Sequence, residues 1–172
     1  PCNMKKLPIL FILSLTLLSA FGQEDIRLEF DKLQVSLQKA DYNSVFKITS
    51  KLLNEHKSDS LKQKPVLIYL NILSAAGLVS KNKLTHSKLL TIATQFIGQN
   101  IESLPYKCVD SSVIAFGAFK FHQDQDGRYL EAVSSNPDAT SIFIFEKYFL
   151  TETFSKNDYT GKYIIATGTL DN

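Results

Sequence analysis

The longest apolar stretch of the chain covers residues 66–79 and reads VLIYLNILSAAGLV. Its polar residues, Tyr69, Asn71 and Ser74, are scattered around the helical circumference and do not form one stripe. Neighbours on several sides cover a helix with this pattern. At a rise of about 1.5 Å per residue it spans about 21 Å, which is less than a bilayer core of about 30 Å. The pattern therefore predicts a central packed helix and no membrane span.

Helical spacing also surrounds this stretch. Before it, apolar residues recur at steps of three and four along two segments, which predicts two amphipathic helices. Asp41 is placed to cap the second of these helices, and Pro65 to begin the central one. A fourth helix is predicted after 80–83. The apolar positions are Ile26, Phe30, Leu33 and Leu37 for the first helix, Val45, Ile48, Leu52 and Leu53 for the second, and Leu84, Leu89, Leu90, Ala93, Phe96, Ile97 and Ile101 for the fourth.

The pattern changes near Pro105, after which aromatic residues become frequent and apolar residues alternate. Strands are predicted over 113–122, 128–133, 142–150 and 162–170. Asp126 and Gly127 provide a strong hairpin signal between the first two strands, because glycine tolerates positive φ at no steric cost.

The predicted fold class is α+β, with N-terminal antiparallel helical hairpins over 23–104 followed by a small antiparallel β-meander over 105–172. The last strand ends two residues before the end of the sequence, so either it is an edge strand or the sequence is truncated. An edge strand exposes unpaired N–H and C=O groups and can accept another strand.

The first 22 residues have the pattern of a secretory signal peptide. Lys5 and Lys6 form a basic start, 7–18 is an apolar run, and Ala20 and Gly22 are the small residues of a cleavage site. We therefore expect an exported protein, periplasmic or extracellular, with no stable membrane insertion after cleavage. The alternative is an uncleaved anchor helix, for which the apolar run is short.

Removal of 1–22 changes the charge and the cysteine count. The chain has 19 basic and 17 acidic residues, and Lys5 and Lys6 are the only charged residues in 1–22, so the remaining 150 residues are formally neutral. A neutral protein lacks the basic surface of a nucleic-acid-binding protein. Cys108 is then the only cysteine, so an exported chain has no internal disulfide and depends on packing for its stability.

Two turns in the helical half resemble those of tetratricopeptide-type repeats. Ala40-Asp41-Tyr42 is followed by Val45 and Leu52-Leu53, and Asn82-Lys83-Leu84 is followed by Ser87 and Leu90. The turns are 42 residues apart, whereas the family period is 34; the tryptophan of the family is missing, and two units are fewer than an array usually needs. The resemblance implies a groove that binds a peptide or partner protein and implies no chemistry.

Catalytic and metal-binding signals are weak. The histidines, His56, His86 and His122, have no metal-ligand spacing, and no phosphate-binding loop or nucleophile motif is present. Asp124-Gln125-Asp126-Gly127 resembles the start of a calcium loop, but the bidentate glutamate is missing and a hairpin turn explains these residues. We therefore predict no catalytic residue, no metal and no cofactor.

The function that the sequence predicts is an exported, non-enzymatic interaction module with a protein or peptide partner. The helices are its scaffold and the aromatic sheet its recognition surface. The alternative is a small periplasmic hydrolase or ligand-binding enzyme that uses Cys108 and His122, if these converge in one cleft. The predicted binding residues are Phe116, Phe119, Phe121, Phe143, Phe145, Tyr148 and Phe149.

Overall fold

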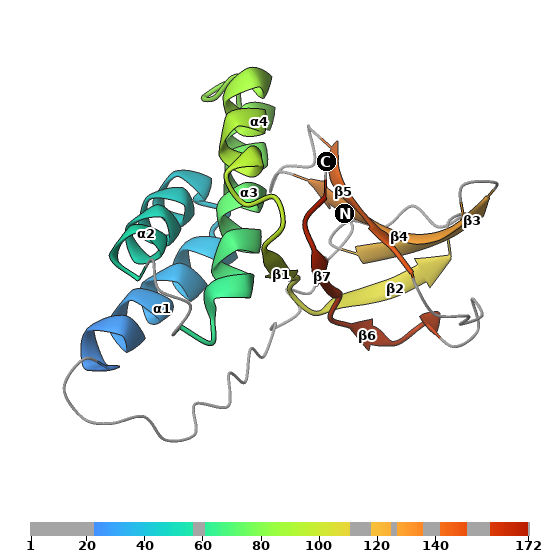
Figure 1. Ribbon diagram of the computed structural model, residues 1–172, viewed down its shortest axis with the longest axis horizontal. Coiled ribbons are helices and arrows are strands. Elements are labelled where there is room, and N and C mark those ends of the chain that lie inside the picture. Colours follow the sequence, from blue (N-terminus) through green and yellow to red (C-terminus); the bar gives the residue numbers. More distant parts are fainter. Residues whose placement is uncertain are drawn as a thin grey trace, which may run out of the picture.

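The computed structural model describes residues 23–56, 61–110, 118–124, 127–135, 142–150 and 159–171, and the predicted signal peptide lies outside these ranges. Four helices come first and two sheets follow, so the α+β class with its helices first is confirmed (Figure 1). The elements are α1 (Gln23–Gln38), α2 (Tyr42–Glu55), α3 (Lys64–Ser80), α4 (His86–Thr94), β1 (Asn100–Glu102), β2 (Tyr106–Asp110), β3 (Ala118–Asp124), β4 (Gly127–Ser135), β5 (Ile142–Phe149), β6 (Tyr163–Ile164) and β7 (Thr167–Thr169).

Helix α3 is the central element, as the apolar run predicts. Every residue in 67–78 is buried, and Pro65 lies in the first turn, where a missing N–H costs little. The helix packs against α2, α4, β1 and β5. These neighbours cover it on several sides, which explains why it has no polar stripe.

The contact between α2 and α3 combines a buried polar cluster with a close approach. The Nδ2 of Asn71 donates hydrogen bonds of 2.9 Å to the Oγ1 of Thr49 and to the Oγ of Ser50. At Gly77 the ring of Tyr42 occupies the space that a Cβ would take. The predicted N-cap is also present, since Asp41 accepts a hydrogen bond from the N–H of Ser44. Polar pairing and the lack of a side chain at Gly77 therefore define how these helices meet.

The fourth helix is shorter than predicted. It ends at Thr94, and Gly98 has a φ of +80°, a backbone conformation that favours glycine. The N–H of Gly98 bonds to the carbonyl oxygen of Leu170, and Ile101 lies in strand β1. The prediction that Ile97 and Ile101 continue the helix was wrong, because the chain leaves the helix to pair with the C-terminal strand.

The five-stranded sheet has the order β5-β4-β3-β2-β6, and β1 and β7 form a separate two-stranded sheet. Strands β3, β4 and β5 are the antiparallel meander, with Asp124 opposite Gly127 at the predicted hairpin. The sheet differs from a simple meander because β2, which the sequence analysis missed, runs parallel to β3. Figure 1 shows β1 and β7 between α3 and the five-stranded sheet.

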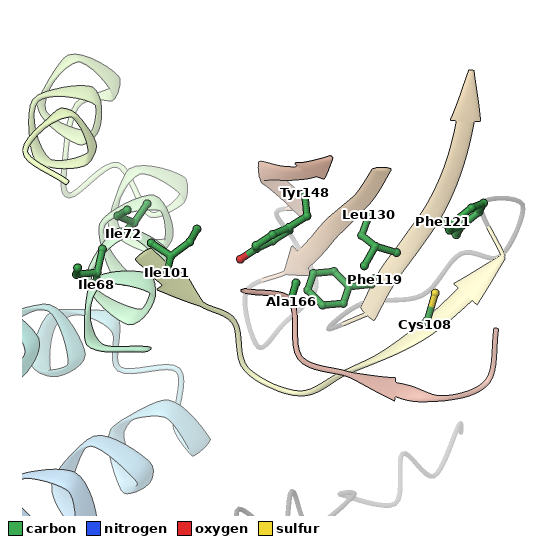
Figure 2. Packing of buried hydrophobic residues seen from close by; sticks show 9 residues of the cluster. All are labelled: Ile68, Ile72, Ile101, Cys108, Phe119, Phe121, Leu130, Tyr148 and Ala166. Atoms are coloured by element: carbon green, nitrogen blue, oxygen red, sulfur yellow. The ribbon is translucent and has the colours of Figure 1, made fainter. Parts of the chain in front are cut away.

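One hydrophobic cluster joins the helices to both sheets. Ile68 and Ile72 of α3 belong to it together with Ile101 of β1 and with Phe119 and Tyr148 of the larger sheet. Figure 2 shows the cluster extending from Ile68 and Ile72 on α3 to Phe121 and Cys108 among the strands of the larger sheet. The two halves of the chain therefore share a core.

No helix in the described part of the chain has both the length and the apolar character needed to cross a membrane.

Candidate functional site

The predicted aromatic surface divides between the core and the outside. Phe119, Phe121 and Tyr148 are buried, and the rings of Phe119 and Tyr148 meet edge to face with centroids 5.5 Å apart. These three side chains cannot reach a partner while the core is intact. Phe149, in contrast, is 63% exposed. Phe116 lies outside the described residues, and Phe143 and Phe145 are on β5, where the structure does not describe their side chains.

The opposite face of the larger sheet carries a packed cluster around Tyr129. The ring of His122 stacks on the ring of Tyr129, with the two centroids 4.9 Å apart and an angle of 7° between the ring planes. The Nζ of Lys147 lies 4.6 Å from the centroid of the Tyr129 ring. The Nε2 of His122 is 3.2 Å from the Oε2 of Glu131. Tyr129 is itself buried, so its ring does not offer an open stacking platform.

Cys108 and His122 do not converge. Cys108 pairs with Phe119 across the parallel β2–β3 ladder, so both side chains point to the core face. His122 is three positions beyond Phe119 on the same strand and points to the opposite face. Cys108 is fully buried, and burial raises the pKa of its thiol, which opposes formation of a nucleophilic thiolate. The arrangement that the hydrolase alternative requires is therefore not formed.

Metal ligands do not gather in the described ranges, where no group of three or more His, Cys, Asp or Glu residues could hold an ion. A surface hollow of about 450 Å³ lies between α1 and α2 and is lined by Ile26, Leu28, Glu29, Lys51, Leu52, Glu55 and His56. The carboxylate of Glu29 forms ion pairs with Lys51 and Lys32 there. The pKa of Glu29 is lowered, and the hydrogen bond from Lys51 is the largest cause. These charges pair with one another and provide no convergent site.

The segment 163–169, which contains β6 and β7, is the clearest open feature. Strand β6 is the terminal strand of the larger sheet and pairs with β2, whereas β7 pairs with β1. Between them, Ala166 is held by Ser103, whose N–H donates to the Ala166 carbonyl oxygen and whose Oγ accepts from the Ala166 N–H, both at 2.9 Å. The segment is therefore hydrogen-bonded along one side at β6, at Ala166 and at β7.

Hydrogen bonds on this anchored side come from alternate residues. The N–H of Leu170 donates to the carbonyl oxygen of Gln99, and the N–H of Ser103 donates to the carbonyl oxygen of Ala166. Hydrogen-bonded pairs alternate along an antiparallel ladder, so Gly168, which lies midway, is hydrogen-bonded to Ile101. In such a ladder the N–H and C=O of Thr167 and Thr169 point away from β1. In the ladder between β6 and β2, hydrogen-bonded residues also alternate, and the N–H of Cys108 donates to the carbonyl oxygen of Lys162. The N–H and C=O of Tyr163, the next residue, therefore point away from β2.

The side chains of the segment alternate in the same way. Ile164, Ala166 and Leu170 pack on the core. Tyr163 is 61% exposed and Ile165 is 52% exposed, and Thr167 and Thr169 are exposed too. No charged residue or proline occurs within 163–169, although sheet edges are usually protected by such residues. The other terminal strand, β5, carries Glu146 and Lys147. We call the outward side of 163–169, where no strand of the described ranges pairs, the open edge.

The sequence predicts one continuous strand over 162–170, which is an edge strand unless the sequence is truncated. The structure has two short strands instead, because the segment passes from β2 to β1 at Ile165 and Ala166. The sequence shows that 163–166 is apolar, but it shows neither which of these side chains face the core nor which two strands lie beside the segment.

Comparison with known proteins does not assign a family: no protein-family model, curated protein or solved structure matches the chain.

Proposed function

We propose that this protein is an exported, non-enzymatic binding module whose protein partner adds a β-strand to the open edge. The observation that carries the proposal is the outward-facing backbone of Tyr163, Thr167 and Thr169, in a segment that contains no charged residue or proline. In this mode of recognition, main-chain hydrogen bonds supply affinity and alternate side chains supply specificity.

The exposed side chains of the edge suggest what the added strand contains. Tyr163 and Ile165 present aromatic and β-branched surface on one face of the segment. Cross-strand pairs with aromatic or β-branched residues each contribute about 0.2–1 kcal/mol relative to alanine. We expect a partner strand with apolar residues at every second position.

The rest of the chain acts as a scaffold that holds this edge. Ala166 belongs to the hydrophobic cluster that contains Ile68 and Ile72 of α3, so the anchored side of the segment is tied to the centre of the fold. A strand that is already ordered loses little conformational entropy on binding, which favours association. The helices therefore support recognition without contacting the partner strand.

A peptide-display experiment tests strand addition. The wild-type chain is used to select from a library of random ten-residue peptides, and the affinity of the selected peptides is measured by fluorescence anisotropy. Thr167→Pro removes the outward N–H and leaves the ladder to β1 intact, because proline is tolerated where an edge faces solvent. We expect selected peptides to have apolar alternation and to bind this variant at least about tenfold more weakly.

Thr167→Ala is the matched control, because it shortens the same side chain and keeps the N–H. Circular dichroism and protection of the Cys108 thiol establish that both variants fold. Equal affinity of selected peptides for Thr167→Pro and Thr167→Ala would contradict strand addition at this edge.

Export is tested independently. The chain with and without residues 1–22 is expressed in a Gram-negative bacterium, and the periplasmic fraction is analysed. We expect the longer chain in the periplasm, shortened at the cleavage site that Ala20 and Gly22 mark. A full-length product retained in the cytoplasm contradicts export and leaves the binding proposal unaffected.

A further inference from the structure

We infer that Gly168 determines the specificity of the open edge, because the space that its missing side chain leaves receives one aromatic side chain of the added strand. This inference rests on the proposed function, since it names a residue that the partner strand carries. The partner is then an extended polypeptide segment with an aromatic residue at one fixed position, opposite Gly168.

The two usual reasons for a glycine in a strand do not apply at Gly168. Its φ is not positive, unlike that of Gly98 and Gly161, so its backbone does not require glycine. Close packing does not require it either: apart from its two chain neighbours, no atom of the described residues lies within 4 Å of where its Cβ would be. A glycine inside a strand often marks a place where a ligand or another backbone approaches. Gly168 is exposed, so such an approach is open.

The free space at Gly168 belongs to the core-facing side of β7. Gly168 lies directly opposite Ile101 and alternates in phase with Ala166 and Leu170, so these residues share one face. Ile101 and Ala166 are members of the hydrophobic cluster drawn in Figure 2, and Leu170 packs against that cluster. We call the space that a side chain at Gly168 would take the Gly168 gap. Its surroundings on this face are apolar.

An added antiparallel strand places one residue beside the Gly168 gap. Thr167 and Thr169 direct their N–H and C=O outward and form the hydrogen-bonded pairs with that strand. Gly168 then lies in the non-hydrogen-bonded pair between them, where the Cα atoms are about 4.5 Å apart and side chains are closest. The partner residue in this pair points to the same face as Gly168 and Ile101.

The distance to β1 favours an aromatic ring in the gap. Adjacent strands are about 4.8 Å apart, so the added strand lies about 9–10 Å from β1, with no side chain at Gly168 between them. A short partner side chain leaves the surface of Ile101 beside the gap uncovered, whereas a ring extends across the glycine toward it. Aromatic residues placed across from edge glycines stabilise sheets in this way.

Peptide selection on two variants tests the inference. Gly168→Leu fills the gap, and Thr167→Leu is the matched control, because it adds the same side chain to the other face and keeps the N–H. We expect the wild type and Thr167→Leu to select an aromatic residue at an odd number of positions from the alternating apolar residues that face Tyr163 and Ile165. We expect Gly168→Leu to select glycine or alanine there. No aromatic preference in the wild type overturns the inference, and so does an unchanged preference in Gly168→Leu.

Affinities of one selected peptide measure the size of the effect. Replacing its aromatic residue with alanine should weaken binding to the wild type about tenfold, because apolar contact is lost. The same replacement should weaken binding to Gly168→Leu by less than about twofold, because the leucine already occupies the gap. Gly168→Ala fills the gap partly and should give an intermediate loss, which keeps the test valid if circular dichroism shows that Gly168→Leu does not fold. Equal losses in the wild type and in the folded Gly168 variants contradict the inference.

Methyl NMR locates the bound ring. The wild-type chain with labelled isoleucine methyl groups is mixed with the selected peptide, and the Ile101 signal is assigned from Ile101→Val. We expect a nuclear Overhauser effect between the ring protons of the peptide and the methyl groups of Ile101. Contacts of the ring with Ile165 alone would place it on the other face and overturn the inference.

Failure of this inference and failure of strand addition can be told apart. A chain that selects extended peptides without the aromatic preference, and loses them in Thr167→Pro, refutes the role of Gly168 and keeps the binding module. A chain that selects no extended peptide refutes both.

Discussion

Helix α3 and the open edge are made of similar residues but have opposite surroundings. Both 66–79 and 163–169 lack charged residues and contain tyrosine, isoleucine, alanine and glycine. In α3, Tyr69 is 1% exposed, whereas Tyr163 in the edge is 61% exposed. The difference teaches that apolar composition alone does not set burial. The number of sides on which neighbours pack decides it.

The two regions also differ in how their backbone N–H and C=O groups form hydrogen bonds. An α-helix forms the hydrogen bonds of its interior within one segment, so the interior of α3 can be covered completely without leaving unpaired backbone groups. A strand needs a neighbour on each side, and among the described strands 163–169 pairs only with β2 and β1, which lie on the same side of it. A segment of apolar residues therefore has no backbone groups to offer a partner when it forms a buried helix, but it does when it forms a strand at a sheet edge.

The largest expected contrast is between Leu67→Ala and Ile165→Ala. Leu67 is fully buried, so its truncation should leave a cavity and lower the free energy of unfolding by about 2–5 kcal/mol. Ile165 is 52% exposed, so Ile165→Ala should change the free energy of unfolding by no more than about 0.5 kcal/mol. Urea denaturation measures both values. Similar losses in the two variants would mean that the edge is buried in the isolated chain.

Glycine substitutions give the second contrast. A Cβ at Gly77 would overlap the ring of Tyr42, whereas a Cβ at Gly168 would meet nothing within 4 Å. Despite the better helix propensity of alanine, Gly77→Ala should lower the free energy of unfolding by about 1–3 kcal/mol through overpacking. Gly168→Ala should be neutral within about 0.5 kcal/mol. Thermal denaturation of both variants is the measurement, and a neutral Gly77→Ala would show that α2 and α3 can separate freely.

Polar residues provide a third comparison. Asn71→Ala leaves the buried hydroxyl of Thr49 without its hydrogen-bond partner from α3, so we expect the free energy of unfolding to fall by about 1–3 kcal/mol. Thr167→Ala removes an exposed hydroxyl, and its effect should remain within about 0.5 kcal/mol. Chemical denaturation monitored by circular dichroism distinguishes the two. A small effect at Asn71 would indicate that water replaces the missing amide.

The smallest contrast involves two tyrosine hydroxyls. The hydroxyl of Tyr69 lies 3.0 Å from that of Tyr106 and links α3 to β2, so Tyr69→Phe should cost about 0.5–1.5 kcal/mol. The hydroxyl of Tyr163 is on an exposed ring, and Tyr163→Phe should change the free energy of unfolding by less than that. Replicate denaturation curves of both variants resolve the difference, and the reverse order would contradict the link between α3 and β2.

Local features of the fold could be predicted from the sequence. The apolar run without a polar stripe predicts the buried helix α3, Asp41 predicts the N-cap of α2, and Asp126 with Gly127 predicts the hairpin between β3 and β4. These features depend on residues that are close together in the chain, so short-range spacing contains the necessary information.

The candidate site was only partly predictable. Alternation along 142–150 and 113–122 indicates strands, but it cannot say which face is covered, and Phe119 and Tyr148 are in the core while Phe149 is exposed. The sequence also suggested an edge strand near the C-terminus, without indicating which strands would lie beside it.

The sequence by itself determined the two kinds of layer and their order. Only the tertiary structure decided that β2 runs parallel to β3, that α4 stops so that β1 can pair with β7, and that 163–169 is paired on one side. The physical reason is that strand pairing joins residues as far apart as Ile101 and Gly168, and no local pattern encodes such a partner.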